Sequence, residues 1–336
     1  MGKYKIVLYY LGLFKSLTLR RFVNFMLVEV SYWLSRVFRK VILKGNPWAA
    51  SIEPTTSCNL RCPECPTGMQ SLSRPKGNMP LDVFGKILDK LSPDLIYLTL
   101  YFQGEPLLNP GFTEMVQLAR ERRIFVSTST NGHYLNNRNV DEIIKSGLNH
   151  LIISMDGTDQ QTYEKYRVKG DLQTVLAGIE RLVAAKKVLK SSLPYIELQF
   201  LVMRHNEHQT EQMHEFAKRS GVDQLSFKTA QVYNFDSENL IIPDLKSKSR
   251  YRQAPDGKWV MAKLIRNRCH RIWSSLVITW DGKVVPCCYD KDADHQTGNL
   301  LNEPLNEIWN NQKYNAFRRQ VLKNRSENEI CRNCGE

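Results

Sequence analysis

From residue 48 onward, short apolar runs of the sequence alternate with longer amphipathic stretches. The run LIYLTLYF (95–102) is almost entirely apolar, β-branched or aromatic, which is typical of a strand buried on both faces. The intervening stretches carry apolar residues at helical spacing, and several follow a capping residue, such as Asp171 before LQTVLAGIERLVAAKK. The predicted strands cover residues 49–55, 95–102, 124–130, 150–156, 195–203 and 225–230. The predicted helices cover residues 81–91, 111–122, 137–146, 171–190 and 207–220.

Six strands, each followed by a helix or a loop, predict a parallel, barrel-like sheet. Eight such pairs would close a full barrel, so six favour an α/β fold with a partial and open (β/α)6 TIM-like barrel over residues 48–235. A polar segment with two prolines and a glycine predicts a linker over residues 236–258. Residues 259–336 are then expected to form a small C-terminal, cysteine-rich α+β domain.

Residues 1–47 predict an amphipathic helical extension. Its stretch 22–38 is apolar except for five polar or charged positions, and it is shorter than the roughly 20 apolar residues that a membrane-spanning helix needs. Lys and Arg flank it, and it contains Trp33 and several Phe residues, a composition that suits a membrane surface. Two interpretations stand. Residues 1–44 either make peripheral contact with the inner face of a membrane or pack on the protein itself or on a partner.

The formal net charge of +13 is unevenly distributed. Residues 1–47 hold nine Lys or Arg against Glu29 alone, and the remaining residues hold 38 basic against 33 acidic side chains. The body of the protein is therefore only mildly basic, and we expect no nucleic-acid partner. A chain of this length with clustered cysteines is not a secreted disulfide framework, which indicates a reducing, cytoplasmic compartment.

The eight cysteines form two groups. Three lie at Cys58, Cys62 and Cys65, and five lie between residues 269 and 334. The metals that accept several thiolates are zinc, copper(I) and iron–sulfur clusters. Structural zinc needs four ligands, whereas three thiolates on one loop can hold three corners of a [4Fe–4S] cluster and leave the fourth iron free.

Other polar motifs follow the predicted strands in the same way as the cysteines. QGEP (103–106) follows the second strand, TNG (130–132) the third, and SMDG (154–157) lies around the end of the fourth. In barrels of this type the chemistry sits at the carboxyl ends of the strands. The sequence therefore predicts that these motifs and the first three cysteines meet at one rim.

The Cys-x3-Cys-x2-Cys spacing after a first barrel strand resembles the signature of radical S-adenosylmethionine (SAM) enzymes. The resemblance implies that Cys58, Cys62 and Cys65 are the catalytic cluster ligands. It also implies that the free iron chelates SAM, which an electron splits to a 5′-deoxyadenosyl radical that abstracts a substrate hydrogen. Such chemistry requires a low-potential electron donor such as ferredoxin or flavodoxin.

The same resemblance assigns roles to rim residues. QGEPLLNP is similar to the family's Gly-Gly-Glu-Pro motif, which implies that Gly104, Glu105 and Pro106 hold the methionyl ammonium of SAM, with a glutamine in place of the first glycine. The STNG segment implies that Thr130 and Asn131 approach the ribose. SMDG with the later YEKYR implies that Ser154 and Arg167 bind the methionyl carboxylate, for which a planar guanidinium is suited.

In the tail, the WDGK turn predicts a hairpin between SLVIT and VVPCC. With its five cysteines, the tail resembles the SPASM or twitch extension of radical SAM enzymes. The resemblance implies an auxiliary [4Fe–4S] cluster. The implied ligands are Cys269, Cys287, Cys331 and Cys334. A full SPASM tail has about seven cysteines, so one cluster is expected, with Cys288 spare or exchanging with Cys287. Four thiolates would also satisfy a structural zinc.

The function expected from these features is hydrogen abstraction from a peptide or a carbohydrate-like substrate. No sequence feature selects between the two substrate classes. The alternative is a non-catalytic iron–sulfur protein that transfers electrons or acts as a scaffold. The rim residues argue against this alternative, because an electron carrier needs no SAM-binding residues.

Overall fold

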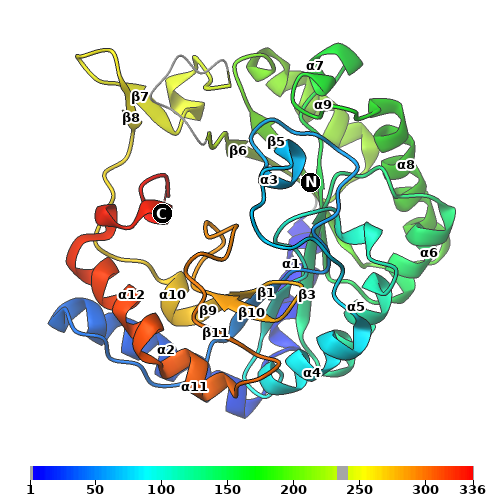
Figure 1. Ribbon diagram of the computed structural model, residues 1–336. Helices are drawn as coiled ribbons and strands as arrows, with labels where there is room; N and C mark the ends of the chain where they lie inside the picture. The colour runs from blue at the N-terminus through cyan, green and yellow to red at the C-terminus, as the bar shows by residue number, and fades with distance from the viewer. Residues whose placement is uncertain (1–2, 233–240, 336) are drawn as a thin grey trace.

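The computed structural model describes residues 3–232 and 241–335. The predicted partial barrel is confirmed, because six parallel strands follow one another in chain order and curve into an open barrel (Figure 1). Each strand falls inside its predicted segment, except that β6 begins one residue earlier than predicted. The strands are β1 (Ala49–Ile52), β2 (Tyr97–Thr99), β3 (Phe125–Thr130), β4 (His150–Ser154), β5 (Tyr195–Val202) and β6 (Gln224–Thr229).

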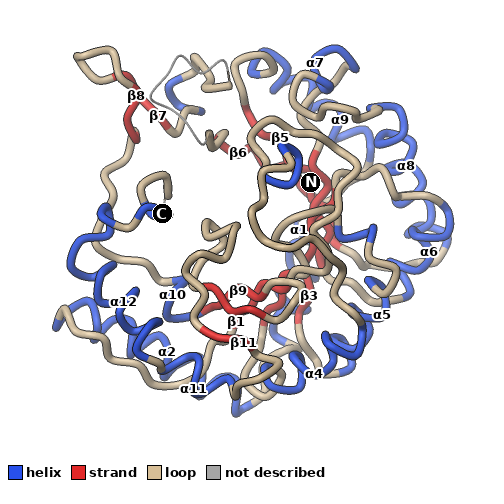
Figure 2. The backbone as a smooth tube through the Cα atoms, in the orientation of Figure 1, coloured by secondary structure: helices blue, strands red, loops and turns tan. Residues whose placement is uncertain are grey.

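Helices cover the outside of this sheet (Figures 1 and 2). Apolar side chains fill the space between the two layers. The helices begin where the sequence supplies a cap; the carboxylate of Asp171, for example, accepts hydrogen bonds from two backbone amides at the start of α8. Of the six helices named next, the sequence predicted every one except the short α7. The helices are α4 (Leu81–Leu91), α5 (Phe112–Glu121), α6 (Asn137–Lys145), α7 (Gln160–Glu164), α8 (Leu172–Val188) and α9 (Thr210–Ser220).

The cysteine-rich tail continues the barrel sheet. Strand β9 (Ser275–Ile278) pairs in parallel with β1, and the expected hairpin joins it to β10 (Lys283–Val285), which pairs with β11 (Gly298–Asn299). Gly282 in the hairpin turn has a φ of +82°, a conformation that favours glycine. Helices α10 (Arg271–Ser274), α11 (Leu305–Asn310) and α12 (Gln312–Asn324) complete the tail. The sheet thus fixes the tail cysteines relative to the first cysteine loop.

Part of the expected linker is structured. Residues 236–240 of that segment lie outside the described residues. The remainder contains β7 (Tyr251–Gln253), which forms a hairpin with β8 (Trp259–Met261). The hydroxyl of Tyr251 donates to Asn333 at 2.6 Å and accepts from the backbone amide of Val232 at 3.1 Å, so the hairpin contacts both the end of the barrel and the chain's last residues.

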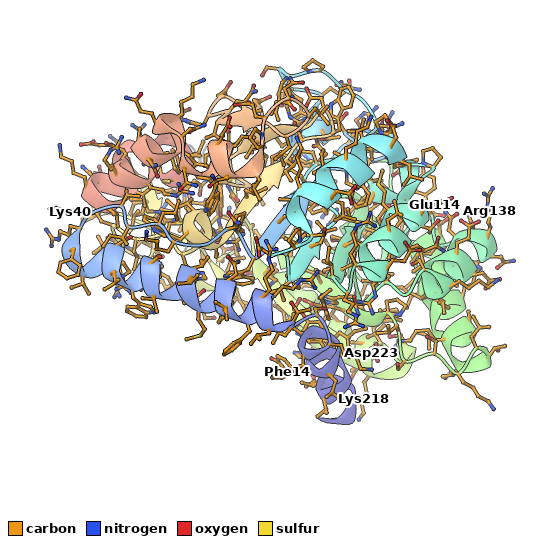
Figure 3. The ribbon with its side chains drawn as sticks, turned by 90° about the horizontal axis from the view of Figure 1, so that it is seen from below. Phe14, Lys40, Glu114, Arg138, Lys218 and Asp223 are labelled. Atoms are coloured by element: carbon orange, nitrogen blue, oxygen red, sulfur yellow. The ribbon has the colours of Figure 1, made fainter. Side chains whose placement is uncertain are left out.

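The N-terminal extension forms α1 (Lys3–Phe14) and α2 (Leu19–Phe38). Helix α2 lies along the body of the protein, and α1 projects from it (Figure 3) but contacts the barrel through Tyr9. Buried Arg21 donates to four backbone carbonyls, two of them in the turn after α5. Farther along α2, Trp273 of the tail donates to the hydroxyl of Ser35. Helix α2 therefore contacts both the barrel and the tail. Among the described residues, no helix is both long and apolar enough to span a bilayer.

A buried ion pair joins the first cysteine loop to the tail. Arg74 and Glu53 share two hydrogen bonds, of 2.5 and 2.7 Å, and both side chains are almost fully buried. Glu53 also accepts from the backbone amide of Trp280 in the tail hairpin. Burial raises the pKa of Glu53, and the hydrogen bonds from Arg74 oppose that rise.

Replacing Glu53 with glutamine should lower the free energy of unfolding by about 3–5 kcal/mol, because the substitution leaves the Arg74 guanidinium buried without a counter-charge. Urea denaturation followed by circular dichroism measures this effect. The matched control is Glu142→Gln in the exposed Arg138–Glu142 pair, where we expect a loss below about 1 kcal/mol. Equal losses in the two variants would contradict the structural role of the buried pair.

Candidate active site

The first three cysteines lie in the loop that follows β1, at the carboxyl end of the barrel strands. Cys65 immediately precedes the short helix α3 (Pro66–Met69), and its backbone amide donates to the carbonyl of Cys62 at 3.2 Å. A Cβ at Gly68 would lie 2.5 Å from that same carbonyl oxygen, so only glycine allows this close approach. The loop is therefore folded tightly around its thiols.

Each of the three sulfur atoms has a polar neighbour from a different part of the rim. The amide nitrogen of Asn131, after β3, lies 3.9 Å from the sulfur of Cys58. A guanidinium nitrogen of Arg167 lies 3.9 Å from the sulfur of Cys62. The sulfur of Cys65 lies 4.0 Å from the amide oxygen of Gln103, which follows β2. The predicted convergence of motifs on one rim is present in the structure.

Glu105 lies at the centre of the rim and is almost fully buried. Its carboxylate accepts from the hydroxyl of Thr130 and from the backbone amide of Asn131, both at 2.7 Å. The preceding Gly104 has a φ of +75°, and a Cβ there would lie 2.4 Å from the carbonyl oxygen of Thr55. Pro106 begins the short 3₁₀ helix η1 (Pro106–Leu108), which Glu105 caps. The Gly-Glu-Pro sequence therefore holds the carboxylate in a fixed position.

Burial raises the pKa of Glu105 to about 7, and hydrogen bonds from Asn131 and Thr130 oppose the rise. A cationic group bound beside this carboxylate would favour its ionised form. The site is thus suited to an ammonium group, and protonation of Glu105 near neutral pH would compete with such a ligand.

Arg167 reaches the rim from the turn after α7. Its Nε donates to buried Asp156 at 2.6 Å, and Asp156 also accepts from the backbone amide of Leu201. Asp156 therefore orients the guanidinium toward Cys62. Ser154 ends β4, where it pairs in register with Gln199 of β5. It lies two residues before Asp156 on the same rim.

The four tail cysteines that were predicted as ligands line one small internal cavity. Arg325, itself almost fully buried, lies at this cavity and donates to the sulfur of Cys334 at 2.8 Å. All eight cysteines of the chain are among the described residues, and none forms a disulfide. The tail thus gathers four thiols beside one buried cation that can balance thiolate charge.

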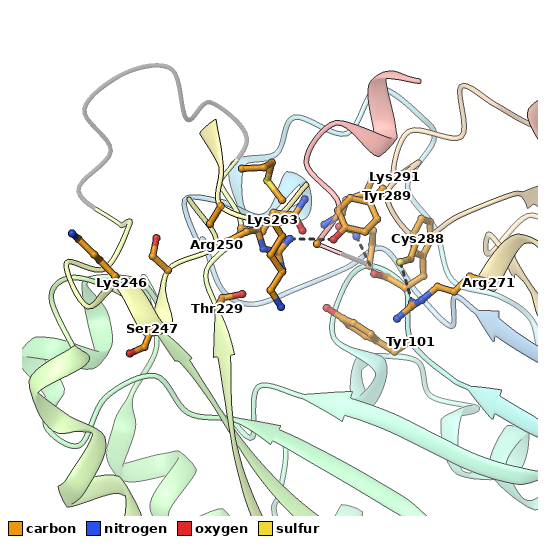
Figure 4. A pocket seen from close by; sticks show the side chains of 17 residues that line it. Tyr101, Thr229, Lys246, Ser247, Arg250, Lys263, Arg271, Cys288, Tyr289 and Lys291 are labelled. Carbon is orange, nitrogen blue, oxygen red and sulfur yellow. Dashed lines mark hydrogen bonds between the residues drawn. The ribbon is translucent and has the colours of Figure 1, made fainter. Parts of the chain in front are cut away.

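Cys288 faces a different cavity from its neighbour Cys287. It lines a cavity of about 630 Å³ whose other lining residues include Gln103 at the rim and Tyr289 and Gly335 near the tail thiols. Arg271 donates to the sulfur of Cys288 at 3.6 Å (Figure 4). The large cavity therefore lies between the first cysteine loop and the tail cysteines.

Five of the 17 residues that line this large cavity are basic. Its basic residues are Lys246, Arg250, Lys263, Arg271 and Lys291. No Asp or Glu is among its lining residues in the described part of the chain. Tyr101, Phe102 and Tyr289 add aromatic surface, and Arg250 donates to the hydroxyl of Tyr289 (Figure 4). The cavity is therefore suited to a ligand that carries negative charge.

The donor set at both sites fits iron–sulfur clusters. Thiolates are the ligands that such clusters take, three on the first loop and four in the tail. Over residues 3–232 and 241–335, no group of three or more His, Cys, Asp or Glu side chains is placed to hold a single metal ion. A cubane cluster is wider than a single ion, so its thiolates need not converge on one point.

Two protein-family models match this chain. The model of the radical SAM superfamily matches residues 52–217, and the model of the SPASM iron–sulfur cluster-binding domain matches residues 269–335. The chain belongs to the radical SAM superfamily. The radical SAM domain binds a [4Fe–4S] cluster and SAM, and the SPASM domain binds auxiliary iron–sulfur cofactors. The expected enzyme class and cofactors are thereby confirmed.

Curated relatives of this radical SAM protein modify cofactors or peptides. It is 26% identical over 300 residues to the tungsten-containing aldehyde ferredoxin oxidoreductase cofactor-modifying protein of Pyrococcus furiosus, covering 80% of this chain and 82% of the relative. It is also 26% identical over 317 residues to the PqqA peptide cyclase of Streptomyces rochei, covering 87% and 82% of the two chains.

Solved radical SAM structures share the fold. Streptococcus suis SuiB bound to S-adenosylmethionine superposes with a TM-score of 0.64 at 12% identity, covering 91% of this chain and 76% of SuiB. The enzyme anSMEcpe with bound AdoMet gives a TM-score of 0.61 at 16% identity, covering 86% and 85% of the two chains. The predicted fold class is thereby confirmed.

Sequence reasoning did not assign several residues that complete these sites. Asp156 is part of the SMDG motif and could have been found as the acid that pairs with Arg167. Gln103 appeared only as a departure from the family motif, yet it lies beside Cys65. Arg325 carries no motif signal, because its role depends on a fold that buries it beside the tail thiols.

Proposed function

We propose that this radical SAM enzyme abstracts a hydrogen from a peptide substrate bound in the large cationic cavity. The observation that carries this proposal is the position of the cavity, which is lined by Gln103 at the rim and by Tyr289 and Gly335 near the tail thiols. A substrate held there would lie between the two thiol sites. Peptide-modifying relatives, including PqqA peptide cyclases and SuiB bound to its precursor peptide SuiA, support the substrate class.

In this proposal, Cys58, Cys62 and Cys65 hold the first cluster. When bound there with SAM, the cluster supplies the reducing electron that makes SAM a source of radical chemistry. The carboxylate of Glu105 binds the methionyl ammonium. The flanking residues Gly104 and Pro106 hold that carboxylate in position. Arg167, oriented by Asp156, and Ser154 bind the methionyl carboxylate.

Thr130 and Asn131 bind the nucleoside side of SAM and also fix Glu105 through their hydrogen bonds. In the tail, the proposed ligands of the auxiliary cluster are Cys269, Cys287, Cys331 and Cys334. Their shared cavity supports this set, and the different cavity of Cys288 supports its exclusion. A ferredoxin or flavodoxin is the proposed electron donor.

The cations of the cavity point to acidic residues in the peptide. Lys263 lines the cavity together with Arg250 and Tyr101 (Figure 4). Lys263 is exposed, so charge reversal there should not disturb folding. An acidic peptide would displace water and counter-ions from these basic side chains. Its binding would therefore weaken as the salt concentration rises.

We expect a glutamate-rich peptide to bind the cluster-loaded enzyme more tightly than the same peptide with glutamines, as measured by fluorescence anisotropy. Lys263→Glu should weaken binding of the acidic peptide about tenfold, which corresponds to about 1.4 kcal/mol. The matched control is Lys258→Glu, which is exposed in the β7–β8 turn and does not line the cavity. Equal affinity for the two peptides, or an equal effect of the two variants, would contradict the proposal.

A further inference from the structure

Helices α1 and α2 expose an unusually apolar surface. Fifteen of the 24 exposed large apolar side chains among the described residues lie on these two helices. Several are very open to solvent, including Leu19 at 80%, Val37 at 71%, Phe38 at 60% and Trp33 at 57% exposed. Contiguous apolar surface of this kind marks an interaction site rather than an ordinary protein surface. One face of α2 therefore packs on the protein, and the opposite face has no partner within the described chain.

A second cationic cavity, separate from the one proposed to bind the substrate, adjoins the end of this apolar face. It has a volume of about 660 Å³ and is lined by the C-terminal end of α2, the segment before α10, and α12. Its cations are Arg36, Arg39, Arg266, Arg268, Arg319 and Lys323. No carboxylate is among its described lining residues. The guanidinium of Arg36 lies 4.6 Å above the ring of exposed Trp33, so the cavity and the apolar face are continuous.

From this juxtaposition we propose that the exposed face of α2 and the cationic cavity form one docking surface for a membrane that contains anionic phospholipids. Apolar side chains such as Val37 and Phe38 would enter the boundary between headgroups and acyl chains. The guanidinium groups beside them would bind lipid phosphates. A nucleic acid would also supply phosphates, but it offers nothing to cover the apolar face.

The position of the docking surface is compatible with catalysis. Tyr9 of α1 packs against Phe125, His150 and Tyr195, the first residues of β3, β4 and β5. Helix α1 therefore lies at the amino ends of the barrel strands, opposite the rim that carries the first cysteine loop. In Figure 3, α1 and α2 lie along one edge of the molecule, and α1 projects beyond it. A membrane bound at this edge would leave the rim open to substrate and electron donor.

The test is sedimentation of the full-length, cluster-loaded protein with two kinds of vesicle, one of phosphatidylcholine alone and one of phosphatidylcholine mixed with phosphatidylglycerol. We expect binding to the mixed vesicles and little binding to the neutral ones. Arg319→Gln with Lys323→Gln should lower the partition coefficient about 30-fold, since each cation near an anionic surface contributes about a factor of five. Trp33→Ser with Val37→Ser and Phe38→Ser should lower it more than tenfold.

The matched control is Arg138→Gln with Lys165→Gln, two exposed cations far from this surface in the sequence and on other helices or turns. This control should bind the mixed vesicles like the unchanged protein. Inorganic phosphate at equal ionic strength should not release the protein, which separates a lipid surface from a free phosphate. Equal binding to both vesicle types, loss of binding in the control, or conversion of a dimer to a monomer by the apolar triple substitution would overturn the proposal.

Discussion

Cys62→Ala is expected to abolish the cleavage of SAM to 5′-deoxyadenosine and to remove the iron of one cluster from the reconstituted protein. Three thiolates from one loop are the complete protein ligand set of the proposed first cluster, so the loss of one leaves two iron atoms without a protein ligand. The sulfur of Cys62 also lies beside Arg167, which makes this position part of the proposed SAM site. Chromatography of the nucleoside product and iron analysis measure the two effects.

The control for this variant is Met69→Ala. Met69 is 42% exposed on α3 in the same loop. It lines neither the large cavity that Cys288 faces nor the small cavity of the four tail cysteines. We expect that variant to retain both its iron and the cleavage of SAM. Retention of cleavage and of full iron content in Cys62→Ala would contradict the assignment of the first cluster.

Glu105→Gln is expected to weaken SAM binding about 30-fold or more, which corresponds to about 2 kcal/mol. The amide keeps the shape of the side chain but removes the charge that pairs with the methionyl ammonium. Equilibrium binding of SAM to the cluster-loaded protein measures the change. The matched control is Glu114→Gln on α5, an exposed carboxylate away from the rim, which should bind SAM normally.

The same carboxylate predicts the pH dependence of SAM binding. Burial raises the pKa of Glu105 to about 7 in the protein without ligand, and the ammonium group requires the ionised form. Affinity should therefore be constant above about pH 7 and fall towards tenfold per pH unit below it. In Glu105→Gln this dependence should disappear. A wild-type affinity that is flat between pH 5 and pH 8 would show that Glu105 does not bind the cation.

The sequence predicted the barrel well because its local signals agree with the final packing. The segment 95–102 is apolar on both sides, and in β2 Leu98 is fully buried, whereas Tyr97 and Thr99 on the opposite face are half-buried. Helix α4 matches its predicted bounds of 81–91, because apolar residues at helical spacing face the core throughout. Where periodicity, capping residues and burial all favour the same structure, the sequence alone is sufficient to predict the element and its bounds.

The sequence patterns did not predict contacts between segments that are far apart in the chain. Nothing local indicates that β9 pairs with β1 and extends the barrel sheet, or that Arg74 and Glu53 join the cysteine loop to the tail. The choice between Cys287 and Cys288 also depends on which cavity each thiol faces. The apolar pattern of α2 was visible, but both of its interpretations remained open because the pattern does not show which face is covered.

The most direct test of the proposed active site is electron paramagnetic resonance of a reduced variant in which the tail thiols are replaced. In this variant Cys269, Cys287, Cys331 and Cys334 become alanine, so that the cluster of the first loop alone contributes to the spectrum. Addition of SAM should then change the signal, because the iron that lacks a protein thiolate gains a new ligand. A spectrum that SAM leaves unchanged would contradict a SAM-binding cluster at Cys58, Cys62 and Cys65.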